Sequence, residues 1–107
     1  MAKFVVLLNW TDQGARTAQD TATRFEQARD AMQQQGVSFD TILWTLGRVD
    51  MVAILDAPDA RTVATALAQL AREGNVRTET LVGFTSDEVR DMMQTVKDKA
   101  QARRSPS

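Results

Sequence analysis

The chain lacks cysteine, histidine and tyrosine altogether across its 107 residues. Without cysteine it can form no disulfide, no thiolate nucleophile and no cysteine-ligated zinc site. Without histidine it lacks the commonest general base and the commonest metal ligand. Thirteen basic and fourteen acidic residues leave a net charge of −1, so we expect no nucleic-acid partner. We likewise expect neither a bound metal nor a cofactor.

Long apolar runs are also missing. The apolar run near the N-terminus covers only residues 4–8, and the polar Asn9 and Asp12 follow it, unlike a secretory signal. No segment approaches the roughly 20 apolar residues that cross a bilayer. We therefore expect a cytoplasmic protein with no membrane partner. One domain over residues 1–101 and a flexible polar tail over residues 102–107 complete the predicted organisation.

The spacing of apolar residues predicts the order strand, helix, strand, strand, helix, strand, helix. Apolar or alternating runs predict strands at 4–8, 39–46, 51–55 and 76–84. Apolar residues at helical spacing predict helices over 21–35, from Pro58 to Gly74, and after Thr85. Thr21 is the predicted N-cap of the first helix, and Thr85 with Glu88 forms a capping-box signature. Residues 10–17 are predicted to be a loop.

This order predicts an α+β, ferredoxin-like βαββαβ fold with a four-stranded antiparallel sheet and an added C-terminal helix. The first two helices cover one face by the right-handed crossover rule. The strands at 4–8 and 51–55 are apolar at nearly every position, so apolar side chains point to the other face too. A patch of that size needs a cover. We expect the sheet of a second copy, in dimeric α/β-barrel pairing; the alternative is the C-terminal helix of the same chain.

Three segments resemble the GYD domain family. They are Trp44-Thr45-Leu46-Gly47-Arg48-Val49-Asp50-Met51-Val52-Ala53-Ile54, the opening at residues 9–14, and residues 74–81. The resemblance covers about residues 3–95. Val49 stands where the family usually has the tyrosine of its name. The resemblance implies a ferredoxin-like bacterial protein of a family without an established activity.

A more distant resemblance involves the effector-binding domain of leucine-responsive-type regulators. It extends from Gly47 and Asp50 through the Pro58 helix start to residues 75–80. Those domains form paired-sheet dimers and bind amino acids near a glycine-containing loop. Because this chain begins at the first strand, with no helix-turn-helix, the resemblance implies a stand-alone ligand-binding or assembly module.

Polar residues at the predicted strand ends form a candidate ligand site. Arg48 suits a carboxylate and Asp50 an amine, while Asn9, Thr11 and Asp12 follow the first strand in a loop rich in donors and acceptors. Turn formation and surface ion pairs are the alternative interpretation. The candidate ligand-binding residues are Asn9, Trp10, Thr11, Asp12, Trp44, Gly47, Arg48, Asp50, Arg77 and Glu79.

Several candidates have a structural alternative of their own. Trp10 and Trp44 suit core or interface anchors as well as a pocket wall. Gly47 suits the positive φ of a hairpin turn. Arg77 and Glu79 are two residues apart, so they share one face of a strand and suit a subunit contact.

Three functions follow from these patterns. The leading one is a homo-oligomeric module that binds or senses a small organic molecule near the subunit boundary. The second is a cofactor-independent small enzyme of the dimeric α/β-barrel type, with Asp12 or Asp50 moving a proton. The third is an assembly or adaptor protein without a small ligand. The missing histidine, cysteine and tyrosine weigh against the enzyme.

Overall fold

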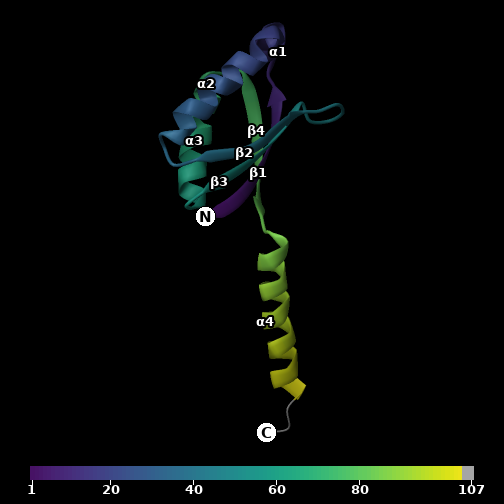
Figure 1. Cartoon of the computed structure of the whole chain (residues 1–107). Coiled ribbons are helices and arrows are strands. Elements are labelled where there is room, and N and C mark those ends of the chain that lie inside the picture. Colours follow the sequence, from purple (N-terminus) through teal and green to yellow (C-terminus); the bar gives the residue numbers. More distant parts are fainter. Residues whose placement is uncertain (105–107) are drawn as a thin grey trace.

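The computed structural model describes residues 1–104 and builds them around one antiparallel sheet in the order β2-β3-β1-β4 (Figure 1). The strands are β1 (Ala2–Trp10), β2 (Ser38–Trp44), β3 (Met51–Ala57) and β4 (Val76–Gly83). The two central strands, β1 and β3, are those whose sequences are apolar almost throughout. This confirms the predicted four-stranded, ferredoxin-like α+β arrangement.

Two helices, α2 (Thr21–Gln33) and α3 (Ala60–Arg72), cover the same face of the sheet (Figure 1). Asp59 caps α3 as its position after Pro58 predicts. Its Oδ1 accepts hydrogen bonds from the backbone N–H and the hydroxyl of Thr62, both at 2.8 Å. These bonds stabilise the carboxylate and hold the pKa of Asp59 below its ordinary value.

The structure corrects two expectations about the chain before α2. Residues 10–17 are not a loop: β1 continues to Trp10, and helix α1 (Asp12–Arg16) and the short 3-10 helix η1 (Ala18–Asp20) follow. The Thr11 hydroxyl caps α1 by accepting the N–H of Gly14 at 3.2 Å. Thr21 is not the N-cap of α2, because Asp20 holds that position and Thr21 is the first helical residue; its hydroxyl accepts the indole N–H of Trp44 at 3.1 Å.

The core lies between the sheet and α2 and α3. Alternate side chains of β1 and β3 point to this side, and none of the core side chains is more than 8% exposed. Full burial of a large apolar side chain contributes about 1.5–3 kcal/mol, so this layer holds the fold together. The buried residues are Phe4, Val6, Leu8, Met32, Val37, Met51, Ala53, Leu55, Ala57, Val63 and Ala66.

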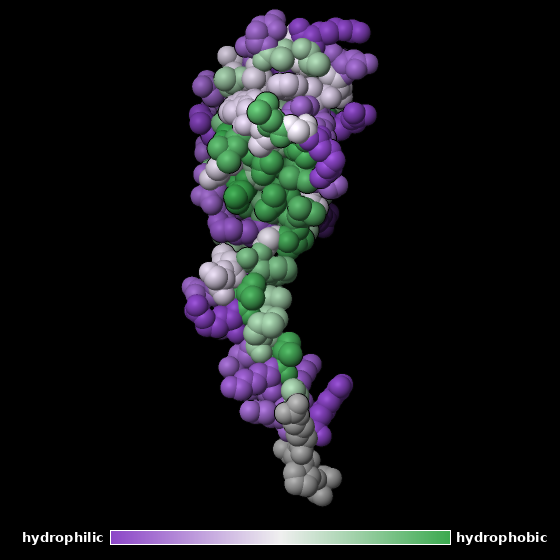
Figure 2. Space-filling model, turned by 90° about the vertical axis from the view of Figure 1, so that its right-hand side faces the viewer, coloured by the Kyte–Doolittle hydropathy of each residue, from purple (hydrophilic) through white to green (hydrophobic). Residues whose placement is uncertain are grey.

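The opposite side of the sheet carries a second apolar layer, which we call the open face. In β1 and β3 it consists of the side chains that alternate with the core, and one leucine from each edge strand extends it. Within residues 1–104 no helix covers it (Figure 1), and it forms the broad apolar patch of Figure 2. The open face comprises Val5, Leu7, Leu43, Val52, Ile54 and Leu81.

The C-terminal helix α4 (Ser86–Arg104) projects away from the sheet (Figure 1). Its apolar residues Val89, Met92, Met93 and Val96 are 40% to 58% exposed. The structure therefore does not show the C-terminal helix sealing the sheet of its own chain, which was the alternative to a second copy.

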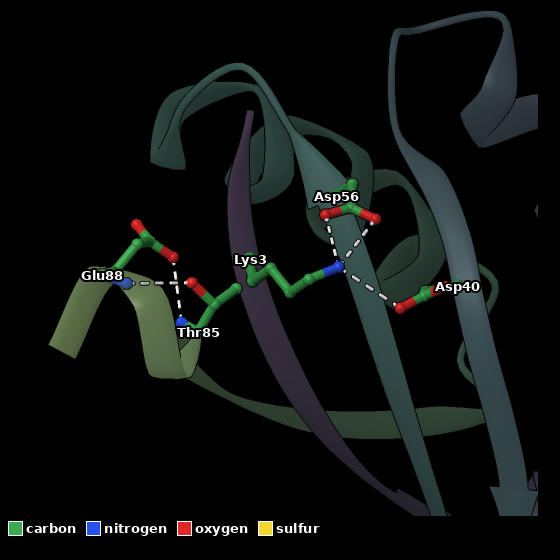
Figure 3. A network of polar contacts seen from close by, with 5 residues as sticks. All are labelled: Lys3, Asp40, Asp56, Thr85 and Glu88. Carbon is green, nitrogen blue, oxygen red and sulfur yellow. Dashed lines mark hydrogen bonds and ion pairs between the residues drawn. The ribbon is translucent and has the colours of Figure 1, made fainter. Parts of the chain in front are cut away.

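The predicted capping box begins α4. The Thr85 N–H donates to Glu88 Oε1 at 2.9 Å, and the Glu88 N–H donates to Thr85 Oγ1 at 3.2 Å (Figure 3). The helix includes residues 102–104, which the sequence had assigned to the tail. The rest of that predicted tail, residues 105–107, lies outside the described residues.

Candidate functional site

Residues from the three family-like segments meet at one end of the sheet. Asp50 joins the hairpin between β2 and β3 to the end of β1: the Trp10 N–H donates to Asp50 Oδ2 at 2.9 Å. In return the Asp50 N–H lies 3.1 Å from Asn9 Oδ1 and 3.0 Å from the Leu8 carbonyl oxygen. Asn9 and Asp50, both candidate ligand residues, therefore also connect two backbone segments.

The turn after β1 is tied to the turn before β4 in the same region. The Thr11 hydroxyl donates to the Gly74 carbonyl at 2.5 Å, and the Thr11 N–H donates to the Asn75 carbonyl at 3.1 Å. Gln13 adds a bond from its side-chain amide to Asn75 Oδ1 at 3.0 Å. Asp12 is exposed in the first turn of α1. Thr11 thus has a structural role here, while the Asp12 side chain points outward.

The hairpin between β2 and β3 is held mainly through its backbone. The Thr45 N–H donates to the Asp50 carbonyl at 2.9 Å, and the Thr45 hydroxyl donates to the Val49 carbonyl. Gly47 has a φ of 106°, a left-handed conformation that glycine adopts without steric cost, as the turn interpretation predicts. The neighbouring Arg48 is exposed.

A shallow polar groove of about 110 Å³ lies beside this network, on the side of the open face. Asn9 on β1 is opposite Arg77 on β4, and Leu7 is opposite Glu79. Within residues 1–104, Arg48, Arg77 and Glu79 form no ion pair with one another or with other residues. The structure therefore brings four candidate ligand residues together. The groove is lined by Leu7, Asn9, Arg48, Val49, Arg77, Thr78 and Glu79.

The two candidate tryptophans lie elsewhere. Trp44 packs edge-on against Phe25 of α2, with ring centroids 6.0 Å apart, and donates its indole N–H to Thr21. Trp10 packs against the core, and its indole nitrogen is buried without a hydrogen-bond partner in the described part of the chain. Both rings are on the helix side of the sheet and do not line the polar groove.

A charged cluster that the sequence analysis did not identify lies at the other end of the open face (Figure 3). Lys3 Nζ donates to the two oxygens of Asp56 at 2.9 and 3.1 Å and to Asp40 at 3.3 Å. The hydrogen bond to Asp56, followed by that to Asp40, raises the pKa of Lys3 above its ordinary value. The partners are 37 and 53 residues apart in sequence, so only the strand register brings them together.

Three further observations on residues 1–104 concern metal ions, membrane spans and proton transfer. No three acidic side chains are grouped to hold a metal ion in this part of the chain. None of its helices combines the length and the apolar character needed to cross a membrane. Of the two carboxylates considered for proton transfer, Asp12 is exposed and Asp50 accepts a backbone hydrogen bond.

The three family-like segments lie within a region that matches a known protein family. The family model of the GYD domain matches residues 4–93. A protein of Thermus thermophilus named glutamine synthetase and cystathionine beta-lyase binding protein is 37% identical over 82 residues. The match covers 76% of this chain and 86% of that relative.

Solved structures share the fold. TTHA0845 from Thermus thermophilus superposes with a TM-score of 0.51 at 23% identity, over 80% of this chain and 96% of that one. FFRP-DM1 gives a TM-score of 0.52 at 9% identity, over 78% of this chain and 100% of that one. At these identities the likeness concerns the arrangement of sheet and helices alone.

Proposed function

Because the chain belongs to the GYD domain family, we propose that it is a binding module that associates with copies of itself and with other proteins. The observation that carries this proposal is the uncovered open face. Leu43 and Leu81, at its two edges, are 59% and 47% exposed, and Val5, Leu7, Val52 and Ile54 lie between them.

A second copy is the occupant that best matches the open face. Two antiparallel sheets pack about 10 Å apart when their apolar faces meet, and a twofold axis brings the same patch of each copy together. Burial of apolar surface is the main favourable term in such an association. Lys3 at one end of the face is already paired with Asp56 and Asp40 of its own chain, so association leaves no unpaired lysine there. We therefore favour face-to-face pairing of the dimeric α/β-barrel type.

A role in binding other proteins is supported by the Thermus thermophilus relative. Its name states that it binds glutamine synthetase and cystathionine beta-lyase, and the match covers most of both chains. We extend that kind of role to this chain, which makes enzymes of these two classes the first partners to test. This is the adaptor function among the three that the sequence left open.

Two neighbouring residues of β4 provide the test of self-association. Leu81→Lys places a charge on the open face, whereas Val82→Lys places the same charge on the other side of the same edge strand. Val82 is 58% exposed, so the control tolerates the lysine. We expect light scattering after size exclusion to show a lower mass for Leu81→Lys only. An unchanged mass for both variants would exclude pairing through this face.

The protein partners are tested with purified enzymes. Glutamine synthetase and cystathionine beta-lyase from the organism that encodes this chain are passed over the immobilised protein, with an unrelated enzyme of similar size as control. Concentration-dependent binding of at least one of the two supports the adaptor role. Binding equal to that of the control enzyme contradicts the extension from the relative.

The polar groove favours a second candidate function, the binding of a small carboxylate such as an amino acid. Arginine recognises carboxylates in bidentate geometry, and Arg48 and Arg77 both line the groove beside the Asn9 amide. The distant resemblance to amino-acid-binding effector domains favours the same ligand class. Because the groove adjoins the open face, a paired copy would enclose it and form a site at the subunit boundary.

This candidate is tested by calorimetry with amino acids and short carboxylic acids. We expect Arg48→Ala or Arg77→Ala to weaken binding roughly tenfold or more, since each charged hydrogen bond contributes about 1.5–3 kcal/mol. Arg61→Ala on α3 removes the same charge from the opposite side of the domain and serves as the control. Binding that survives both groove changes would place the ligand elsewhere.

A further inference from the structure

Helix α4 carries an apolar stripe that the rest of its chain does not use. Val89, Met92, Met93 and Val96 follow helical spacing and remain 40% to 58% exposed, with Ala100 one turn further on. The buried core of residues 1–104 contains no residue of α4. Most helices in proteins depend on the packing of an apolar face for their stability, which leaves α4 in need of a partner.

The charges along α4 are divided between its two halves. Acidic residues gather in the first half, with Asp87, Glu88 and Asp91, and basic residues in the second, with Lys97, Lys99 and Arg103. Two such helices side by side in opposite directions place each acidic half beside a basic half. In the same direction they place like charges together, which is unfavourable.

The stripe and its flanking charges are also self-complementary in one register. When two α4 helices cross in opposite directions about a centre between residues 94 and 95, Val89 faces Ala100 and Met93 faces Val96. At 100° per residue, Glu88 and Lys99 lie on the same flank of the stripe, and Arg103 continues the stripe itself toward the C-terminal end. In this register Glu88 comes to lie beside the turn from Lys99 to Arg103 of the other helix.

On the other flank of the stripe, this register brings Arg90 near Lys97 of the other helix, and the pairing of Arg90 with an aspartate offsets that repulsion. Arg90, on the other flank, is paired with Asp87 of its own helix at 2.9 Å, and Asp98 accepts a hydrogen bond from Gln94 at 3.0 Å. Both contacts stay within one helix, so they are available in the paired and the unpaired state.

We propose that α4 pairs antiparallel with α4 of a second copy, as a self-association contact separate from the open face. The stripe continues from the patch on the sheet (Figure 2), so a second copy paired with the open face could also contact α4. If the two α4 helices met within such a face-to-face pair, they would run parallel and bring like charges together. The antiparallel helix therefore comes from another copy, and α4 joins sheet-paired units into a larger assembly.

The two contacts are separated by point variants of the full chain. Val96→Asp places a charge in the α4 stripe, and Thr95→Asp places it outside the stripe. Light scattering should show the mass of Val96→Asp reduced to half that of the wild type, with no change for Thr95→Asp. Combining Val96→Asp with Leu81→Lys should give a monomer. An unchanged mass for Val96→Asp alone would overturn the α4 contact.

The same variants distinguish a failure of the sheet pairing from a failure of the α4 contact. If the open face does not pair, Leu81→Lys leaves the mass unchanged, while Val96→Asp still converts the assembly to monomers. The α4 contact would then stand alone as the self-association element.

Cysteine cross-linking tests the direction of the helices, because the chain has no native cysteine. Under mild oxidation, a mixture of Val89→Cys and Ala100→Cys should form the mixed disulfide, and Val89→Cys alone should form little. Asp98→Cys, on the opposite side of the helix, is the control that should not cross-link. Efficient Val89–Val89 linkage would show parallel helices, and linkage of Ala100→Cys to a Leu43→Cys variant would show α4 on a sheet; either result would overturn the proposal.

Discussion

At the scale of single residues, Asp50 combines a place beside the polar groove with a role in the backbone network. Its carboxylate accepts the Trp10 N–H, and its own N–H is bonded to β1. Arg48, two residues earlier, forms no such bond within residues 1–104 and is exposed. In this hairpin, Asp50 therefore stabilises the turn, while Arg48 remains available to bind a ligand.

This difference predicts opposite effects of two alanine changes. Asp50→Ala leaves the Trp10 N–H without its acceptor, and we expect it to lower the free energy of unfolding by about 1–3 kcal/mol. Arg48→Ala should stay within about 0.5 kcal/mol of the wild type, as most exposed substitutions do. Urea denaturation measures both values. Equal losses for the two variants would contradict the structural role of Asp50.

Gly14 gives a second residue-scale prediction. It is buried in α1, and a Cβ added there would lie 2.0 Å from the carbonyl oxygen of Asn75. Backbone atoms cannot move aside cheaply, so Gly14→Ala should cost about 1–3 kcal/mol, the usual range for overpacking. Gly83→Ala is the matched control, because the nearest atom there is 3.7 Å away. Thermal unfolding of the two variants should therefore differ clearly, with only Gly14→Ala less stable than the wild type.

At the scale of elements, two acidic residues hold helix N-termini and make them sensitive to acid. Asp59 accepts bonds from Thr62 at the start of α3, and Glu88 accepts the Thr85 N–H at the start of α4. Backbone hydrogen bonds are the first cause of the lowered pKa of each carboxyl group. A lowered folded pKa means that the unfolded chain binds the proton more readily.

We therefore predict a loss of stability on the acid side. The contribution of each carboxylate is fully present above its unfolded pKa, whose ordinary values are 3.8 and 4.5, and is lost as the pH falls through the folded pKa. Asp59→Asn keeps a good capping side chain but removes the titration. The wild type should accordingly lose more stability than Asp59→Asn between about pH 5 and pH 3. Parallel pH profiles for the two proteins would contradict this role of Asp59.

Most helices and strands could be predicted from the sequence. Continuous apolar runs located the strands, and residues with a strong local signal, such as Asp59 after Pro58 and Thr85 before Glu88, located two helix starts. The two short helices before α2 were missed because five and three residues are too few for a periodic pattern. The sequence was sufficient to predict a helix start wherever the capping contacts lay within one turn of the helix.

The sequence could not predict which side chains of β2 face the helices, for a different reason. Phe39 to Leu46 is apolar on both sides of the strand, so no alternation tells which residues face the helices. A register irregularity between Phe39 and Thr41 then turns Ile42 and Trp44 toward the helices and Leu43 toward the open face. Trp44 was therefore grouped with a site on the opposite side of the sheet.

At the scale of the whole molecule, the candidate site was predicted only in part. Asn9, Arg48, Arg77 and Glu79 were found because polar residues at the ends of apolar strands stand out in the sequence, and they line one groove. The Lys3 cluster and the bonds between Asn9 and Asp50 join residues far apart in the chain, so they required the strand register. The apolar open face was inferred correctly, since the two central strands are apolar on both sides while the crossover rule places the first two helices on one side only.

Under the proposed pairing of the uncovered face, the folding of one copy depends on a second copy. If the open face pairs as proposed, unfolding also requires dissociation, and a partner at a hundred times its Kd stabilises the folded state by about 2.7 kcal/mol. We predict that the Tm rises by several degrees over a hundredfold increase in protein concentration. Leu81→Lys should weaken this dependence, while Val82→Lys retains it. Scanning calorimetry across that range measures the effect. A wild-type Tm independent of concentration would mean that the exposed leucines at the edges of the sheet contribute nothing to assembly, and that the open face remains in water.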